Sequence, residues 1–338
     1  MKEKGNEYPK VSFVMPVLNE EKTIRKCLDS ILNLDYPKEK IEILIARGPS
    51  TDNTNKILNR YAKRYRNIKL LNNPTGNTAT GRNICIENST GDMIMNYSGH
   101  TIAEKNLLKE LALRLKKLPE DIAGIGCSNL PPKKQSLIGK AAGVAFSSLM
   151  GGKNIFPQHA SYNEERYVEH MSFTCYRREI FDKVGKFDPI FWCGQDAEFD
   201  IRVRKAGYKI LYTPKTKVYH FKRESLRSLF RQMYRYGIAR AKIIKKHPDA
   251  MKPSHFIGTA GVIGLILLIV LTALEILPLW FLFSIILIYV LLCLFSSVMI
   301  TKDLKIVILS LVAYIAIHFG YGIGFLRGLI SRRLPWQK

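Results

Sequence analysis

Three carboxylates stand close together in the stretch Trp192–Gly207: Asp196, Glu198 and Asp200. They open a predicted helix that ends in basic residues, and this order compensates a helix dipole. The pattern alone therefore predicts a well-capped surface helix. Asp196 differs because it follows the apolar stretch Phe191–Gly194, at a junction of loop and helix where its side chain can face a cleft. A carboxylate beside apolar and aromatic groups can act as a general base.

The chain has 338 residues and a net charge of +24, which calls for a negatively charged partner. Nucleic acid is disfavoured because zinc-finger spacings, Arg-Gly repeats and basic helices with heptads are missing from the sequence. Anionic lipid and phosphorylated substrates remain. The segment at about 225–246 is basic, with Leu229, Phe230 and Met233 interleaved. It predicts an amphipathic helix at an anionic membrane face, or a basic wall around a phosphate.

Short apolar runs alternate with amphipathic segments over the first 130 residues. The predicted strands are Val11–Val17, Ile41–Ala46, Ile68–Leu71, Met93–Tyr97 and Ile122–Cys127. Strands that alternate with helices predict a mostly parallel, doubly wound α/β sheet that is covered on both faces. Ligands bind such sheets at the carboxyl ends of the strands. The loops Pro16–Glu21, Arg47–Asp52 and Ser98–Thr101 follow predicted strands and should lie there.

The pattern is looser after residue 130. Leu137–Met150 predicts either a helix against the membrane or a loop that closes over a ligand. Lys209–Tyr212 and Lys217–Phe221 predict two short edge strands. His159 and His170 flank a polar stretch, which is either a solvated loop or part of an acceptor-binding loop.

Three apolar segments close the sequence: 256–274, 279–300 and 306–330. Each is long enough to cross a bilayer, which takes about 20 residues. The polar tail 1–10 lacks the apolar core of a signal peptide, so the first two-thirds should stay in the cytosol. Six scattered cysteines agree with this, since they predict buried thiols in a reducing compartment.

The topology of the last apolar segment is open. The positive-inside rule favours Thr301–Lys305 in the cytosol. A third complete crossing would leave Arg327 and the basic residues after it outside, against the same rule. The segment is therefore either re-entrant or an exception. His318 within it is either functional or engaged in a hydrogen bond between helices, because polar groups are costly in a bilayer.

Several stretches, in order, resemble the motifs of the family 2 glycosyltransferases, which have the GT-A fold. Val11–Glu21 is similar to the opening of that family. Gly48–Thr54 resembles its glycine-rich Ser-Thr-Asp turn, and Asn73–Pro74 with Gly81–Asn83 its next segment. Gly194–Asp196 resembles its Glu-Asp motif, with Gln in place of Glu. The ordered series covers roughly residues 10 to 245, so the resemblance implies a catalytic domain at 11–245 and a membrane anchor at 256–330.

The resemblance continues into the basic segment and includes one departure. Gln232–Tyr236 is similar to the Gln-x-x-Arg-Trp motif of processive members, and Tyr236–Arg240 fits a branch with a Tyr-Gly-x-x-Arg ending. Arg47 stands where the family usually has an acid. Donor recognition is therefore altered, or Asp52 takes over that role.

The resemblance implies inverting transfer of a sugar from a nucleotide-diphosphate donor. Such transfer needs a base for the acceptor hydroxyl and positive charge for the leaving diphosphate. By motif match, Asp196 is the base, and the fork geometry of Arg235 suits the pyrophosphate. The donor-binding residues implied in the same way are Pro16, Asn19, Glu20, Asp52, Arg82, Ser98, Gln232 and Arg235.

The metal motif of the family departs as well. Its Asp-x-Asp or Asp-x-His appears here as Ser98-Gly99-His100. His100 matches the ligand position, so the resemblance implies a divalent cation, Mn²⁺ or Mg²⁺, although imidazole suits Zn²⁺ better. His220 is a candidate second ligand by chain order. The alternatives are polar packing of both histidines, and neutralisation of the diphosphate by Arg235 and neighbouring basic residues without metal.

The predicted function is sugar transfer to a lipid-linked or growing glycan acceptor at the cytosolic face of the cell membrane, by a multi-pass enzyme in contact with membrane lipids. A short anchor favours single-sugar addition over processive synthesis with export. One alternative is a polyprenyl-phosphate sugar synthase, in which Asp196 matters less because the acceptor is already anionic. Another is a non-catalytic nucleotide-sugar-binding subunit or scaffold, suggested by Ser98 and Arg47. The retained Asp196, Gln232 and Arg235 argue against it.

Overall fold

The computed structural model describes residues 8–132, 135–151, 163–221 and 225–331. The chain forms two compact units. The sheet unit comprises Met1–Leu130 and Ser161–His220, and the helical unit comprises Pro131–Ala160 and Phe221–Lys338. The basic segment at 225–246 thus groups with the anchor helices. The predicted domain boundaries at 11–245 and 256–330 remain a prediction.

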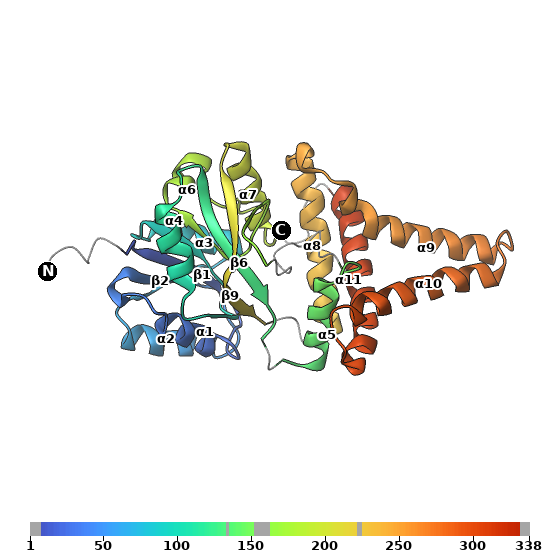
Figure 1. The fold of residues 1–338 in the computed structure, drawn as a ribbon, viewed down its shortest axis with the longest axis horizontal. Helices are drawn as coiled ribbons and strands as arrows, with labels where there is room; N and C mark the ends of the chain where they lie inside the picture. Colours follow the sequence, from blue (N-terminus) through green and yellow to red (C-terminus); the bar gives the residue numbers. More distant parts are fainter. Residues whose placement is uncertain (1–7, 133–134, 152–162, 222–224, 332–338) are drawn as a thin grey trace. The chain divides into compact units, whose positions relative to one another are not determined.

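The described residues of the sheet unit form nine strands in one sheet, in the order β3-β2-β1-β4-β8-β6-β9-β5 with β7 on β9. Figure 1 labels β1, β2, β6 and β9 of this sheet. Neighbours β3, β2, β1 and β4 are parallel, as are β6 and β9, whereas β8 runs antiparallel between β4 and β6. The strands are β1 (Val11–Val17), β2 (Ile41–Arg47), β3 (Ile68–Asn72), β4 (Met93–Asn96), β5 (Thr101–Ala103), β6 (Ile122–Leu130), β7 (Arg166–Val168), β8 (Thr174–Arg177) and β9 (Lys209–His220).

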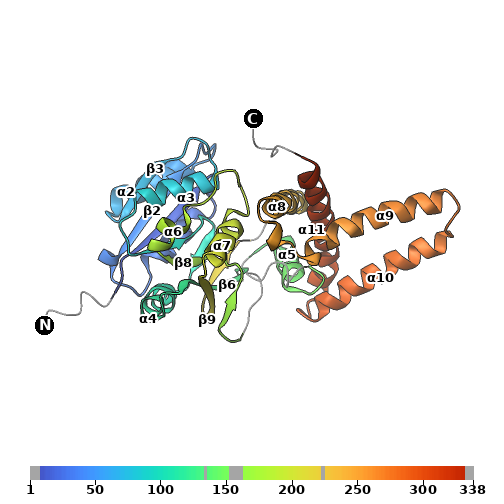
Figure 2. The same cartoon turned by 90° about the horizontal axis from the view of Figure 1, so that it is seen from above.

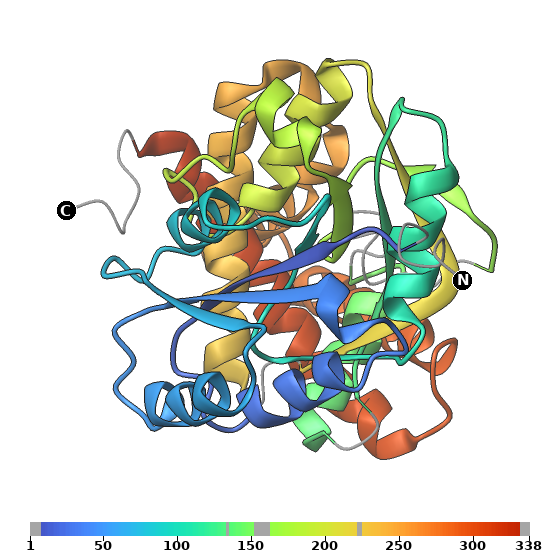
Figure 3. The same ribbon diagram turned by 90° about the vertical axis from the view of Figure 1, so that its left-hand side faces the viewer.

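Helices cover both faces of this sheet, because alternate residues of the buried strands point to opposite sides. Phe13 and Met15 belong to the core on one face, and Val14 belongs to the core on the other. The helices are α1 (Ile24–Leu32), α2 (Thr54–Arg64), α3 (Thr78–Glu87), a π-helical turn at Lys109–Leu113 that continues into α4 (Arg114–Lys117), α6 (Glu179–Val184) and α7 (Gln195–Lys205). Figure 3 shows α1 and α2 below the central strands and α6 and α7 above them. The predicted mostly parallel, doubly wound sheet is confirmed.

The predicted pair of short edge strands is wrong. Residues 209–220 form one strand, β9, which lies inside the sheet between β6 and β5. Pro214 interrupts the apolar pattern, and the register shifts there: Cys127 pairs with Thr213, but Ser128 pairs with Lys217. A bulge accommodates a residue that has no N–H for the ladder. The short strands β5, β7 and β8 were also missed.

The helical unit consists of α5 (Leu137–Ser147), α8 (Leu226–Lys246), α9 (Ile257–Ala273), α10 (Leu279–Val298) and α11 (Leu304–Ile330). Within the described part of the chain, three helices are long and apolar enough to cross a membrane: Pro253–Ala273, Leu279–Val298 and Leu304–Ile330. They correspond to the three predicted apolar segments. The glycine-rich third segment is one continuous helix. Leu137–Ser147 forms a helix, as one of the two interpretations of Leu137–Met150 predicted, and its position against a membrane remains a prediction.

Glycines on α11 bring it against α8. A methyl group added at Gly320, Gly324 or Gly328 would lie only 2.8, 2.1 or 2.9 Å from a carbonyl oxygen of α8. Small residues at four-residue spacing allow two helix backbones to approach this closely. The oxygens belong, in the same order, to Phe230, Tyr234 and Ile238. The two helices therefore run parallel, in one register.

His318 joins three segments of the helical unit. Its Nε2 lies 2.7 Å from the carbonyl oxygen of Met150, so Nε2 carries the proton, and Nδ1 accepts from the hydroxyl of Tyr289 at 2.8 Å. The predicted hydrogen bond between helices is confirmed, because Tyr289 belongs to α10. One turn earlier, Tyr314 donates to Ser148 Oγ at 2.6 Å. The end of α5 is thereby fixed to the middle of α11.

Candidate active site

The loops that follow β1 and β2 are hydrogen-bonded to each other. Asn19 adopts a left-handed conformation with φ of 55°, which Asn tolerates better than most residues. Its Oδ1 accepts from the backbone N–H of Thr51 at 2.8 Å, and Glu20 N–H donates to Thr54 Oγ1 at 2.7 Å. Asn19 therefore shapes the loop that presents Glu20.

Asp52 caps the start of α2 and reaches the first loop. It accepts from the N–H of Thr54 at 2.9 Å and from that of Glu21 at 3.2 Å. Desolvation alone would raise the pKa of Asp52, but hydrogen bonds from Thr54 and from backbone N–H groups outweigh it and lower the pKa. Arg47, at the unusual position, donates to Asn59 Oδ1 at 3.1 Å, so its guanidinium contacts α2.

Four predicted residues lie near the end of β4: Glu20, Ser98, His100 and His220. His100 Nδ1 lies 2.7 Å from Glu20 Oε1, and the rings of His100 and His220 are 4.5 Å apart between centroids. The antiparallel pairing of Thr101 in β5 with His220 in β9 brings the histidines together. Ser98 Oγ is 2.8 Å from Thr101 Oγ1. His220, the second ligand candidate by chain order, thus lies beside His100, and its role as a ligand remains a prediction.

These residues do not complete a metal site by themselves. Among the described residues, no three His, Cys, Asp or Glu side chains are grouped so that they could hold a metal ion. The Nδ1 of His100 already faces Glu20, and a hydroxyl occupies the position where the family has its first carboxylate. The donor set is too small for a resident ion of the Mn²⁺ or Mg²⁺ type, which prefers several oxygen ligands.

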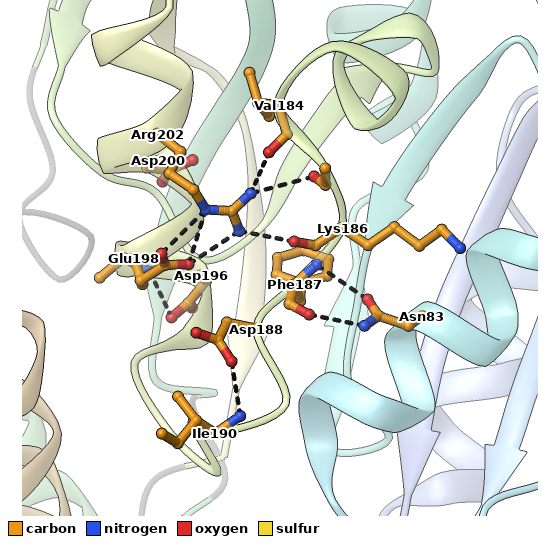
Figure 4. Close-up of polar contacts among 12 residues, drawn as sticks. Asn83, Val184, Lys186, Phe187, Asp188, Ile190, Asp196, Glu198, Asp200 and Arg202 are labelled. Carbon is orange, nitrogen blue, oxygen red and sulfur yellow. Dashed lines mark hydrogen bonds and ion pairs between the residues drawn. The ribbon is translucent and has the colours of Figure 1, made fainter. Parts of the chain in front are cut away.

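The Gly81-Arg82-Asn83 motif of α3 fixes the chain that leads to α7. Gly81 lies against β1, because an added methyl group would be 2.9 Å from Pro16 Cβ. The Arg82 guanidinium stacks over the ring of Phe187 at 5.2 Å. Asn83 exchanges two hydrogen bonds with the backbone of Phe187, at 2.7 and 3.0 Å (Figure 4). The motif therefore positions the segment that precedes Asp196.

The helix α7 begins after Gly194, which has a φ of 72°. Glu198 is fully buried and is bound by Arg202, whose Nη2 lies 2.9 Å away. The same guanidinium donates to the carbonyl oxygens of Val184 at 2.5 Å and Lys186 at 2.7 Å (Figure 4). The prediction of a surface helix is thus wrong for Glu198. Through Arg202, its carboxylate connects α7 to the loop after α6.

Asp200 is also fully buried, and it holds His170. Its carboxylate accepts from Tyr176 Oη at 2.5 Å, from Met171 N–H at 3.1 Å and from His170 Nδ1 at 2.7 Å. Burial raises the pKa of Asp200, against the opposing effect of these donors. The other nitrogen of His170, Nε2, lies 3.9 Å from Asp196 Oδ2. Asp196 keeps 15% of its side chain exposed and is the accessible member of the three carboxylates.

Sequence reasoning missed His170 and Asp200 as partners of Asp196. Asp196 and Asp200 are four residues apart and so share one face of a helix, which was an available signal. His170 lies far from them in the sequence, and only the folding of the chain brings it close. The prediction of a solvated loop is wrong for His170, because its imidazole is hydrogen-bonded to Asp200. His159 lies outside the described residues.

The predicted donor-binding residues divide between the units. Gln232 and Arg235 belong to α8 of the helical unit, and their role in donor binding remains a prediction. The sheet unit contributes the rest at the ends of β1, β2 and β4 and on α3: Pro16, Asn19, Glu20, Asp52, Arg82 and Ser98.

Comparison with known families decides the identity of the chain. The model of "Glycosyl transferase family 2" matches residues 12–185, about half of the chain, and that of "Glycosyl transferase family group 2" matches residues 99–326. The chain is a family 2 glycosyltransferase. Its resemblance to that family in the ordered motifs is therefore confirmed, as is the prediction that it is an enzyme.

Two relatives of this glycosyltransferase have names that indicate an activity or a pathway. One, from Methanococcus voltae, is named dolichyl N-acetyl-alpha-D-glucosaminyl phosphate 3-beta-D-2,3-diacetamido-2,3-dideoxy-beta-D-glucuronosyltransferase. It is 31% identical over 242 residues, which cover 70% of this chain and 74% of the relative. The other is the succinoglycan biosynthesis protein ExoA of Rhizobium meliloti (strain 1021), 30% identical over 241 residues, 70% of each chain.

Solved structures share the GT-A-like fold of this glycosyltransferase. The mannosyltransferase PcManGT from Pyrobaculum calidifontis, solved with GDP-Man and Mn²⁺, has a TM-score of 0.61 at 18% identity and covers 91% of this chain and 87% of its own. S. aureus TarS 1–349, solved with UDP, has a TM-score of 0.51 at 14% identity, with 94% and 90% covered. At these identities the likeness concerns the fold.

Proposed function

We propose that the glycosyltransferase moves a sugar, with inversion, from a nucleotide-sugar donor to a hydroxyl of a lipid-linked glycan at the cytosolic membrane face. The observation that carries this proposal is the placement of Asp196. It is an accessible carboxylate at the start of α7 and lies 3.9 Å from His170, which the buried Asp200 holds. The name of the archaeal relative, which acts on a dolichyl-linked sugar, supports the acceptor class.

In this reaction Asp196 takes the proton of the acceptor hydroxyl as its oxygen bonds to the anomeric carbon. The bond from that carbon to the donor phosphate breaks, and the nucleoside diphosphate leaves with its electron pair. His170 acts as a positioning residue: its Nδ1–H is fixed by Asp200, and this turns Nε2 toward Asp196. Arg235 and Gln232 are proposed to bind the donor, together with the predicted residues at the strand ends.

A divalent cation remains part of the proposal, in a limited form. His100 would supply one imidazole and Glu20 its neighbouring carboxylate, with His220 as a second candidate. The cation would arrive with the donor, because these side chains alone are too few to hold it. When bound, it would offset charge on the leaving diphosphate. PcManGT, which was solved with GDP-Man and Mn²⁺, supports this view.

The proposal is tested with detergent-purified protein, a panel of nucleotide sugars and two acceptors, a polyprenyl-diphosphate-linked sugar and polyprenyl phosphate. Asp196→Asn should reduce transfer to the sugar hydroxyl by at least about 100-fold, the usual contribution of a general base, while donor binding persists. The matched control is Asp182→Asn, which removes an exposed carboxylate from α6. Transfer only to polyprenyl phosphate would support the synthase instead. Absence of both transfer and donor hydrolysis in folded protein would support a scaffold.

A further inference from the structure

The three apolar helices differ in how much of their surface the protein covers. In the most apolar window of each, 11% of residues are buried in α9, 11% in α10 and 50% in α11. On α9, Ile266, Leu267, Ile269 and Val270 are all exposed, so apolar side chains point outward on every side. The consecutive residues Ile285–Ile288 of α10 are likewise exposed. Helices that are apolar and exposed all round belong in lipid.

α11 has two different faces. Its exposed apolar residues recur at helical spacing, and Ile308, Val312, Ile315 and Ile323 mark the stripe. The opposite face, which carries the glycines that contact α8, is buried. A helix that lies in the membrane surface and a crossing helix at the edge of a bundle can both show one apolar stripe, so the neighbours of α11 decide between them.

The helix packed along the second half of α11 is strongly basic. α8 exposes Arg227, Arg231 and Arg235 at four-residue intervals. Near its end, Lys242 Nζ lies 2.5 Å from the carbonyl oxygen of Ser331, and Lys245 bonds to that of Leu329. If α11 crossed the bilayer, the parallel α8 would enter it with these charges, which is costly.

The first half of α11 has neighbours that also oppose a crossing. Ser148 and Met150, just after α5, are hydrogen-bonded to Tyr314 and His318. This segment leaves the sheet unit after β6, and the chain re-enters that unit before β7. A crossing α11 would bring the non-helical backbone at 148–151 into the hydrocarbon.

Figures 1 and 2 show the arrangement that follows. In both views the hairpin of α9 and α10 runs across α8 and α11 and projects away from them. We propose that, among the described helices, α9 and α10 alone cross the membrane, and that α11 lies with α5 and α8 along its cytosolic surface. The apolar stripe of α11 faces the acyl chains, and α8 packs on the opposite face of α11, away from the acyl chains.

This arrangement removes the conflict with the positive-inside rule. Two crossings return Lys302 and Lys305 to the cytosolic side, and Arg327 stays there because α11 does not cross. Glu275, at the turn between α9 and α10, is placed on the far side. The inference concerns only the helical unit and does not depend on the transfer reaction.

Sidedness is tested with single cysteines and a membrane-impermeant maleimide, applied to spheroplasts and to inverted vesicles of the expressing host. Cys193→Ser removes the one cysteine that is not buried. We expect Glu275→Cys to react in spheroplasts, and Lys302→Cys and Ser331→Cys to react only in inverted vesicles. An epitope tag after Lys338 should resist protease in spheroplasts. The proposal is overturned if Ser331→Cys reacts in spheroplasts or if protease removes the tag from spheroplasts. It is also overturned if Glu275→Cys reacts only in inverted vesicles.

Depth distinguishes a surface helix from a re-entrant one, which would give the same sidedness. Nitroxides on cysteines at Ile308, Ile315 and Ile323 should report one shallow depth from their accessibility to oxygen and to a nickel chelate in vesicles with anionic lipid. Ile266→Cys in α9 is the deep control. A label at Ile315 as deep as the one at Ile266, with shallower labels on either side, overturns the surface placement. If the protein shows the expected sidedness and depth but no sugar transfer, the proposed function is contradicted and the membrane placement stands.

Discussion

His170 Nδ1 lies 2.7 Å from the buried carboxylate of Asp200. Asp200 has no exposed surface, and its two other donors, Tyr176 and the backbone of Met171, leave it little freedom to move. The opposite edge of the imidazole faces Asp196. The carboxylate proposed as the base thus lies 3.9 Å from an imidazole that is anchored in the core of the sheet unit.

Replacement of His170 tests this support. His170→Gln should lower kcat by about 10- to 100-fold, because a misplaced reacting group costs rate on this scale. KM for the donor should change little, and His170→Asn should retain more activity if its amide reaches the Nδ1 position. In a double-mutant cycle, His170→Gln should add almost nothing to Asp196→Asn. Fully additive losses would show that His170 acts independently of Asp196.

The ion pair between Glu198 and Arg202 should be important for stability. Glu198→Ala leaves the mostly buried Arg202 without its carboxylate, and breaking a buried pair in this way costs about 3–5 kcal/mol of the free energy of unfolding. Denaturant unfolding of the purified protein measures the loss. Glu179→Ala, which removes an exposed carboxylate from α6, should change it by less than about 0.5 kcal/mol. Equal effects of the two changes would contradict the structural role of Glu198.

Asp52 predicts a pH dependence of stability. Its hydrogen bonds hold the folded pKa below the ordinary 3.8 despite desolvation. A depressed pKa adds stability above the unfolded pKa, and the gain disappears as pH falls through the folded pKa. The difference in thermal midpoint between wild type and Asp52→Asn should thus be constant above about pH 5 and shrink below it. A difference that grew on acidification would contradict this sign.

Metal dependence can be separated from donor binding by calorimetry. Nucleoside diphosphates should bind more tightly with Mn²⁺ than without it, and His100→Ala should remove most of that gain while leaving metal-free binding unchanged. His220→Ala tests the second candidate in the same titration. Binding that ignores both the ion and His100 would favour a site neutralised by arginine and lysine alone.

The sequence predicted the first half of the sheet well because its signals are local. The strands β1 to β4 are short apolar runs, and the loops after them hold Glu20, Asp52 and His100, which were predicted from the family motifs. The strand β9 was split because Pro214 reads as a break, whereas a bulge accommodates it.

What could not be predicted depends on contacts between distant segments. Nothing in the spacing of His170 indicates that β8 and α7 will enclose it with Asp200. The glycines of α11 are visible in the sequence, but their partner α8 lies far back in the chain. Local sequence patterns predict helices and strands, but contacts between distant segments determine which polar groups form a site.

The register between α8 and α11 also sets an order of assembly. During synthesis α8 leaves the ribosome well before α11, with the whole α9–α10 hairpin between them. Leu229 and Met233 of α8, which are buried in the folded unit, therefore lack their contacts with α11 until α11 is synthesised. A nascent chain whose sheet unit has folded still lacks α11. Until α11 is synthesised, a lipid surface or a chaperone can cover the apolar face of α8.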